Sequence, residues 1–169
     1  RRSSAGRDRD DLSPEATGLI MSAADPRRLA AERRRSRRLA MQALYQWQMA
    51  GENVQEIINQ FLAEQDVKGA DLAYFRELIE KITQSTDELD EAISPLLDRP
   101  IEELGAVERG ILYIATYELL HRIDIPYKVV ISEAVALTKK FGADQAHKFV
   151  NGVLDHAAKE TRKLEQGSF

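Results

Sequence analysis

A cluster of arginines is the strongest candidate for chemistry in this chain. Residues 27–38 contain seven arginines and one acidic residue, a net charge of +6, whereas the whole chain carries −4 and the remaining residues therefore −10. Guanidinium groups bind phosphates, and an otherwise acidic body repels nucleic acid everywhere else. The segment predicts a nucleic-acid site. The alternative is a solvated helix start or a basic tail.

An aromatic residue shares one face with these arginines. In a helix, at about 100° per residue, Arg34, Arg38 and Tyr45 lie within about 40° of one another. The apolar stripe of the same helix is centred more than a right angle away, so Tyr45 is predicted to face solvent and Trp47 to be buried. Arginines beside a ring that stacks on an unpaired base favour single-stranded RNA as the ligand. Alternatively, Tyr45 packs on a neighbouring helix.

Motifs of the common enzyme classes are missing from the sequence. The glycines are scattered and form neither a dinucleotide-binding loop nor a P-loop. His121, His147 and His156 lack the spacing that places two imidazoles on one helix face toward a metal. There is no cysteine, and acidic pairs such as Glu102 and Glu103 are expected on solvated faces. We therefore predict a protein that is not an enzyme and uses no metal and no cofactor.

Length and composition indicate one globular domain. The chain has 169 residues, of which 43% are hydrophobic and 31% charged, enough for one well-buried core. No apolar run is long enough to span a membrane, and no apolar stretch of a secretory signal follows a basic start. We therefore expect no membrane association and a cytoplasmic location.

Helical periodicity from Pro26 onward predicts an all-α fold. Apolar residues recur at the three- and four-residue spacing of helices in seven segments, and none alternates with the period of two that a half-buried strand needs. The first helix should end near Gly51. The fifth, around residues 107–120, has the broadest apolar face and should lie centrally.

Residues that favour helix ends predict the later boundaries. The fourth helix should run through Leu97, and the last two should be separated by a short turn. The expected boundary residues are Thr86 or Asp87 as the cap of the fourth helix, Pro100 as its stop, Pro126 in the first turn of the sixth, Gly142 as its left-handed end, and Asp144 as the cap of the seventh.

The two ends of the chain differ from this pattern. Residues 1–26 are rich in small, polar and charged residues without sustained apolar periodicity, and are predicted to be a mostly disordered extension. The RNA-binding domain is expected to span residues 27–164, followed by a tail over 165–169.

Several segments, in order along the chain, carry a family resemblance. They are RRRSR (33–37) leading into QALYQW (42–47), FLAEQDVK (61–68), YFREL (74–78), EELGAVERGIL (102–112), YEL (117–119), IPYKVVISEAVAL (125–137) and HKFVNGVLD (147–155). Together they resemble the NusB family of transcription antitermination proteins over roughly residues 30–160. The last two segments are specific to that family, whereas an arginine-rich helix start is common.

The resemblance implies a fold, partners and site residues. The fold is one of seven helices in two roughly perpendicular subdomains. The implied partners are the ribosomal protein NusE, the single-stranded boxA element of ribosomal RNA leaders, and an antitermination complex with RNA polymerase. No catalysis is implied. With Arg38 added from the helical spacing, the RNA-binding residues are Arg33, Arg34, Arg37, Arg38, Tyr45, Phe141, Gln145, Lys148, Phe149 and Asn151. The NusE-facing surface falls around the fourth and fifth helices and includes Glu108.

The sequence departs from the usual family pattern at four positions. Gln145 replaces an acid beside the RNA surface, which removes a repulsion and predicts higher affinity for RNA alone. Tyr113 replaces an arginine in the fifth helix and bears on details of the partner surface. Ser132 replaces an asparagine, and Ser36 an alanine in the basic motif.

Two other functions remain open from the sequence. A NusB-like domain also precedes the catalytic domain of ribosomal RNA cytosine-5 methyltransferases, so the chain can be read as a fragment of such an enzyme. A purely protein-binding helical adaptor explains the amphipathic helices but gives the seven arginines no role.

Overall fold

Helices form all the regular structure of the part of the chain that the computed structural model describes, residues 25–166. They are α2 (Pro26–Ala50), α3 (Val54–Glu64), α4 (Leu72–Gln84), α5 (Thr86–Ile93), α6 (Ala106–His121), α7 (Tyr127–Phe141) and α8 (Ala146–Thr161), with 3-10 turns at Ser94–Leu96 and Ile101–Glu103. The predicted all-α class with seven helices is confirmed. Most of the expected extension, residues 1–24, and the tail residues 167–169 lie outside the described residues.

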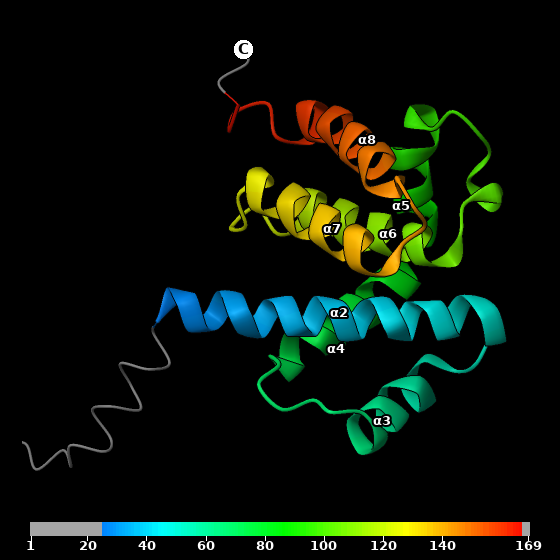
Figure 1. Ribbon diagram of the computed structural model, residues 1–169, viewed down its shortest axis with the longest axis vertical. Helices are drawn as coiled ribbons and strands as arrows, with labels where there is room; N and C mark the ends of the chain where they lie inside the picture. The colour runs from blue at the N-terminus through cyan, green and yellow to red at the C-terminus, as the bar shows by residue number, and fades with distance from the viewer. Residues whose placement is uncertain (1–24, 167–169) are drawn as a thin grey trace, which may run out of the picture.

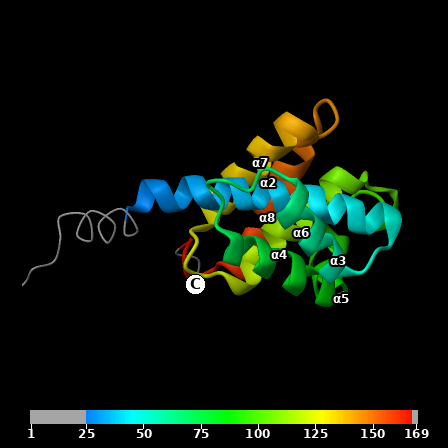
Figure 2. The same ribbon diagram turned by 90° about the horizontal axis from the view of Figure 1, so that it is seen from below.

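The helices form two groups on either side of the long helix α2. Figure 1 shows α2 crossing the molecule, with α3 below it and α7 and α8 above it. Helices α3 and α4 pack with α2, while α5, α7 and α8 pack around α6. In the turned view of Figure 2, α2 again runs the length of the folded part. The fold therefore places the basic start of α2 beside the second group of helices.

Helix α6 lies at the centre of this arrangement, as predicted. It packs against α2, α4, α5, α7 and α8, and all its residues from 110 to 119 are buried. A helix that is buried all round joins several packing surfaces. Leu44, Phe75, Leu89, Ile111 and Leu154, from five different helices, belong to one apolar core and are fully buried. Truncating such a side chain to alanine typically costs about 2–5 kcal/mol.

The ends of α2 follow the predicted chemistry. Asp25 accepts a hydrogen bond from the backbone N–H of Arg27 at 3.0 Å, and Pro26 is the first helical residue. Gly51 ends the helix at φ 65°, the left-handed conformation that glycine adopts without strain. Helix α2 therefore begins one residue before the domain boundary predicted at residue 27.

The middle of the chain corrects two predicted boundaries. Thr86 is the first residue of α5 and Ser85 its cap residue, without a side-chain hydrogen bond, so neither Thr86 nor Asp87 caps the helix. Helix α5 ends at Ile93, well before Pro100. Pro95 lies in the 3-10 turn that follows, and its missing N–H cannot continue the hydrogen-bond ladder of α5.

The turn between α7 and α8 also differs from the prediction. Pro126 is the cap residue of α7, immediately before its first turn. Gly142 is extended (φ −84°, ψ 176°), and a Cβ there would lie 2.8 Å from the carbonyl oxygen of Thr138. Glycine is therefore required at position 142 because the Thr138 carbonyl oxygen approaches it closely, and not because the turn is left-handed. The left-handed residue is Gln145 (φ 66°), and it, not Asp144, occupies the cap position of α8.

Candidate nucleic-acid interface

The outward face of α2 forms a basic groove with α7. A hollow of about 170 Å³ between the two helices is lined by Arg34, Arg35 and Arg38 of α2 and by Lys140 and Phe141 of α7. The guanidinium of Arg38 lies 5.1 Å from the centre of the Phe141 ring, and the Lys140 ammonium lies 5.6 Å from it. Helix packing therefore brings together the end of the basic segment and Phe141, which are far apart in sequence.

Tyr45 extends this groove along α2. Its side chain is 43% exposed, as predicted from the helical spacing. Tyr45 and Phe141 line a second hollow of about 230 Å³, together with Met41 and Gln42 of α2 and Val107 of α6. Because Phe141 borders both hollows, cationic side chains and two aromatic rings form one continuous track. We call the track formed by Arg34, Arg35, Arg38, Tyr45, Lys140 and Phe141 the α2–α7 groove.

Arg37 points the other way and is buried. Its residue surface is only 4% exposed, and its Nε donates to Glu118 Oε2 of α6 at 2.8 Å. The Tyr74 hydroxyl donates to the same carboxylate oxygen. Burial raises the pKa of Glu118, an effect that the nearby Arg37 charge opposes. Arg37, which was predicted to contact RNA, is therefore committed to the core of the fold through its ion pair with Glu118.

Arg33 lies beside Arg37 around the same tyrosine. The guanidinium of Arg33 is 5.3 Å from the centre of the Tyr74 ring. The guanidinium of Arg122, which follows the last residue of α6, is 5.1 Å from the same ring centre. Arg33 also lies 3.8 Å from Asp124, with its side chain 21% exposed. Burial raises the pKa of Tyr74, so the phenol stays neutral among these charges. Arg33 therefore sits at the edge of a polar network that joins α2, α4 and α6.

Acidic residues near α7 offset much of the charge of the arginine segment. Arg34 donates to Glu133 of α7 at 3.0 to 3.2 Å, in addition to the pairs of Arg33 with Asp124 and Arg37 with Glu118. The +6 segment is thus not a free cationic site on a distant acidic body. Within the described residues, Arg35, Arg38 and Lys140 form no ion pair with a carboxylate, since Arg35 donates to the Gly69 carbonyl and the other two lie against Phe141.

The predicted site residues around α8 do not all reach the α2–α7 groove. Gln145, in the turn between α7 and α8, and Lys148, in the first turn of α8, are exposed. Phe149 is half-buried beneath Arg99, whose guanidinium lies 5.3 Å from the ring centre. Asn151 lines a separate groove of about 570 Å³ between α7 and α8. Residues two positions apart on a helix are separated by about 200° around its axis, so Phe149 and Asn151 face in different directions.

Glu108, the predicted partner contact, supports the same turn. It lies in the first turn of α6, and its Oε1 accepts a hydrogen bond from the backbone N–H of Ala143 at 2.7 Å. A Cβ at Gly105 would lie 2.5 Å from the other carboxylate oxygen. The candidate partner contact is therefore joined directly to the turn that carries Gln145.

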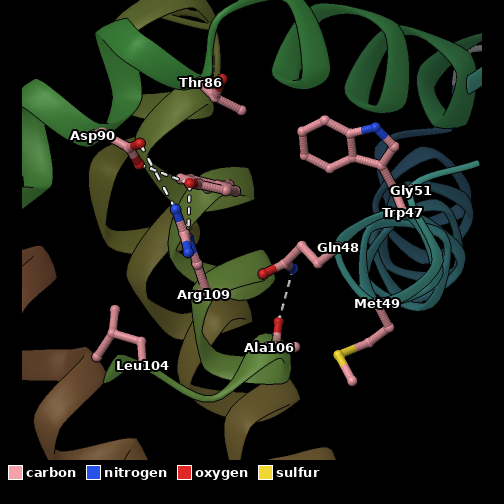
Figure 3. Close-up of a pocket in the computed structure, with 10 residues that line it drawn as sticks. Trp47, Gln48, Met49, Gly51, Thr86, Asp90, Leu104, Ala106 and Arg109 are labelled. Carbon is pink, nitrogen blue, oxygen red and sulfur yellow. Dashed lines mark hydrogen bonds and ion pairs between the residues drawn. The ribbon is translucent and has the colours of Figure 1, made fainter. Parts of the chain in front are cut away.

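A cleft lies on the other side of α6, between α5 and the end of α2. Figure 3 shows the Trp47 ring of α2 pointing toward Asp90 and Arg109 on the opposite wall, and Met49 also lines the cleft. The Tyr113 hydroxyl donates to Asp90 at 2.7 Å and accepts from Arg109 Nε at 2.9 Å, and burial raises the pKa of Tyr113 to about 12. Trp47 is half-buried here, which corrects the prediction that it is buried. Tyr113 is buried and supports this wall from within.

Comparison with known proteins identifies the family. The model of the NusB family matches residues 34–159, most of the chain. The chain belongs to the NusB family.

Relatives and solved structures agree over nearly the whole NusB length. The transcription antitermination protein NusB of Shewanella amazonensis is 56% identical over 125 residues, which cover 74% of this chain and 93% of that protein. The structure of T. maritima NusB superposes with a TM-score of 0.71 at 36% identity, covering 80% of this chain and 96% of that one. A structure described as antitermination factors NusB and NusE in complex with dsRNA gives a TM-score of 0.70 at 32% identity. The match covers 76% of this chain and 97% of that one.

The sequence analysis named Arg33 and Arg37 but missed their inward direction, and it did not identify Glu118 or Glu133. Arg33 and Arg37 stand seven residues before Ala40 and Leu44, which places them on the buried stripe of α2, so their inward direction was visible in the spacing. Glu118 and Glu133, which hold arginines of α2, are 81 and 99 residues away from their partners and leave no local signal.

Neither a metal centre nor a membrane span is found in the described part of the chain. Within residues 25–166, no group of histidine and acidic side chains is placed to hold a metal ion. No helix in the same range is long and apolar enough to cross a bilayer.

Proposed function

We propose that this chain is a transcription antitermination factor that binds boxA RNA of ribosomal RNA leaders together with NusE, in an antitermination complex with RNA polymerase in the cytoplasm. The observation that carries the proposal is the α2–α7 groove. It combines Arg38 and Lys140, two cations without a carboxylate partner among the described residues, with the exposed ring of Tyr45 and the half-buried ring of Phe141.

The groove favours an unpaired strand over a duplex. Guanidinium and ammonium groups contact phosphates of either form, whereas an aromatic ring stacks only on a base that is free of its neighbours. Tyr45 and Phe141 line a hollow of about 230 Å³ between helices, a size that suits a single unstacked base. The related complex described with dsRNA makes the comparison of the two RNA forms a necessary part of the test.

The turn between α7 and α8 supplies a route by which a partner strengthens RNA binding. Glu108 holds the Ala143 N–H at 2.7 Å, and Gln145 and Lys148 follow within five residues. A basic partner that docks on Glu108 and fixes this turn would also add positive charge beside the groove. Thermodynamic linkage then requires RNA to tighten partner binding by the same factor.

The experiment is an RNA titration in three arms. Fluorescence anisotropy compares a boxA-like single strand, a scrambled strand and the corresponding duplex, each with and without saturating NusE. We expect the boxA-like strand to bind best and NusE to tighten its binding about 5- to 150-fold, the usual range of coupling. Equal affinity for all three RNAs, or no effect of NusE, would contradict the proposal.

The partner surface has its own test at Glu108. Glu108→Lys removes both the negative charge and the acceptor for Ala143, whereas Glu108→Gln keeps an oxygen for the hydrogen bond and removes only the charge. If charge attracts NusE, both variants weaken NusE binding. If only Glu108→Lys does so, the carboxylate acts through the turn, and if neither does, NusE docks elsewhere.

The methyltransferase alternative gains no support from the comparisons. The relatives at 52% to 56% identity are named as antitermination proteins, and 93% to 98% of their length is matched. We therefore assign the chain no catalytic role.

A further inference from the structure

We propose that Glu133 is an affinity-determining residue that holds down RNA binding by occupying the guanidinium of Arg34. The inference rests on the proposed RNA-binding function and concerns the same α2–α7 groove. Nothing in the sequence pattern of α7 marks Glu133, because its partner lies 99 residues earlier in the chain.

The contact between the two side chains is a fork. Arg34 Nε lies 3.2 and 3.1 Å from the two Glu133 carboxylate oxygens, and Nη2 lies 3.0 Å from Oε1. This Nε–Nη2 edge is one of the edges with which arginine binds a phosphate in bidentate fashion. The Glu133 carboxylate thus stands in for an RNA phosphate on Arg34.

The position of Glu133 makes the contact persistent. Its side chain is only 14% exposed, whereas that of Arg34 is 62% exposed. Glu133 borders the α2–α7 groove on one side and, on the other, the hollow lined by Arg33 and Arg37. A carboxylate packed between two helices has little room to move, so a phosphate that approaches Arg34 meets the negative charge of Glu133 as well.

Arg38 shows what Arg34 would contribute without this acid. Both arginines line the same groove one helical turn apart, but Arg38 lies against the Phe141 ring and keeps its positive charge uncompensated. Arg34 and Glu133 together are neutral. In the groove, Arg38 is therefore available to bind a phosphate, whereas Arg34 is neutralised by Glu133. This neutralisation limits the affinity of the isolated chain for RNA of any sequence.

The test is Glu133→Gln in the full chain, with binding of a boxA-like single strand measured over a range of salt concentrations. Glutamine preserves the size of the side chain and an oxygen for Arg34, and removes the charge. We expect affinity to rise about threefold to tenfold at low salt. The log–log salt dependence should steepen by up to about 0.7, the value for one additional phosphate neutralised on a single strand.

Two comparisons separate a local effect from a general one. Glu160→Gln changes the net charge equally, at an exposed residue of α8 whose carboxylate lies 3.6 Å from the Lys163 ammonium. It should leave RNA affinity nearly unchanged. In an Arg34→Ala background, Glu133→Gln should no longer steepen the salt dependence, because the guanidinium that it would release for an additional phosphate is absent. Thermal unfolding of each variant checks that the fold is kept.

The outcomes are distinct from those of the proposed function. If the wild type binds no RNA, the proposed function fails. If the wild type binds RNA but Glu133→Gln binds it equally or more weakly, the carboxylate positions Arg34 or is irrelevant to binding, and the inference is wrong. Equal gains from Glu133→Gln and Glu160→Gln, or a steeper salt dependence that persists without Arg34, would also overturn it.

Discussion

Arg37 and Arg38 are neighbours in sequence on α2, yet they belong to two different regions of the molecule. Arg37 is 4% exposed and paired with Glu118, in a polar network that surrounds Tyr74 between α2, α4 and α6. Arg38 is exposed, in the α2–α7 groove, against Phe141. One arginine-rich segment thus serves two purposes: its inward members hold the helices together, and its outward members are available to a ligand.

The largest difference between the two regions should be in folding stability. Arg37→Ala leaves the Glu118 carboxylate buried without its main charge partner, and we expect a loss of about 3–5 kcal/mol in the free energy of unfolding. Arg38→Ala, the matched control, should change it by no more than about 0.5 kcal/mol. Urea denaturation of both variants measures the difference. Similar stability losses would contradict the assignment of Arg37 to the core.

Removing an aromatic ring from the outward region should affect RNA binding and not folding. Tyr45→Ala is expected to weaken binding of a boxA-like single strand by about 1–3 kcal/mol, the usual effect of losing one stacked base. Because Tyr45 is 43% exposed, the melting temperature should change little. Tyr45→Phe keeps the ring and should keep the affinity. A large fall in melting temperature for Tyr45→Ala would show that the side chain supports the core.

A smaller effect is expected from one outward charge. Arg38→Ala should lower the slope of log affinity against log salt by about 0.7, because one fewer phosphate is neutralised. Arg38→Lys keeps the charge and should restore the slope, though not the planar contact with Phe141. The measurement is a salt titration of RNA binding. An unchanged slope in Arg38→Ala would place the phosphate contacts outside the α2–α7 groove.

The smallest expected effect is on folding stability at acid pH and comes from Asp124, at the edge of the polar network around Tyr74. Hydrogen bonding to Arg122, assisted by the charge of Arg33, lowers the pKa of Asp124 below its ordinary value. The resulting stabilisation is present above the unfolded-state pKa of about 3.9 and is lost as pH falls through the lower folded-state value. Asp124→Asn should therefore lose less stability than the wild type when the pH is lowered from 5 to 3, as followed by urea unfolding. Parallel curves would show that Asp124 contributes nothing.

The sequence predicted the fold better than it predicted the turns. Apolar spacing along α2 to α8 reports which face of each helix is buried, so the number of helices and the central place of α6 followed from it. The turn at Gly142 did not, because extended and left-handed glycines look alike in sequence and the close approach to Thr138 exists only after α7 has formed.

The site was predictable where its residues share one helix and not where they meet across helices. The exposure of Tyr45 beside Arg38 followed from helical spacing alone. The pairs of Arg34 with Glu133 and Arg37 with Glu118 join residues 99 and 81 positions apart, and which acid meets which arginine is decided by the packing of α2 on α6 and α7. A count of charges along the sequence therefore overstated the cationic site.

Mapping RNA crosslinks tests the central claim most directly. A boxA-like single strand carrying 4-thiouridine is bound by the full chain with NusE, irradiated, and the crosslinked peptides are identified by mass spectrometry. If RNA binds in the α2–α7 groove, crosslinks should appear on the peptide that contains Tyr45 and on the peptide that contains Phe141. In the Tyr45→Ala variant, the crosslink on the first of these two peptides should disappear. Crosslinks confined to α3 or to the groove around Asn151 would show that RNA binds elsewhere and would contradict the account.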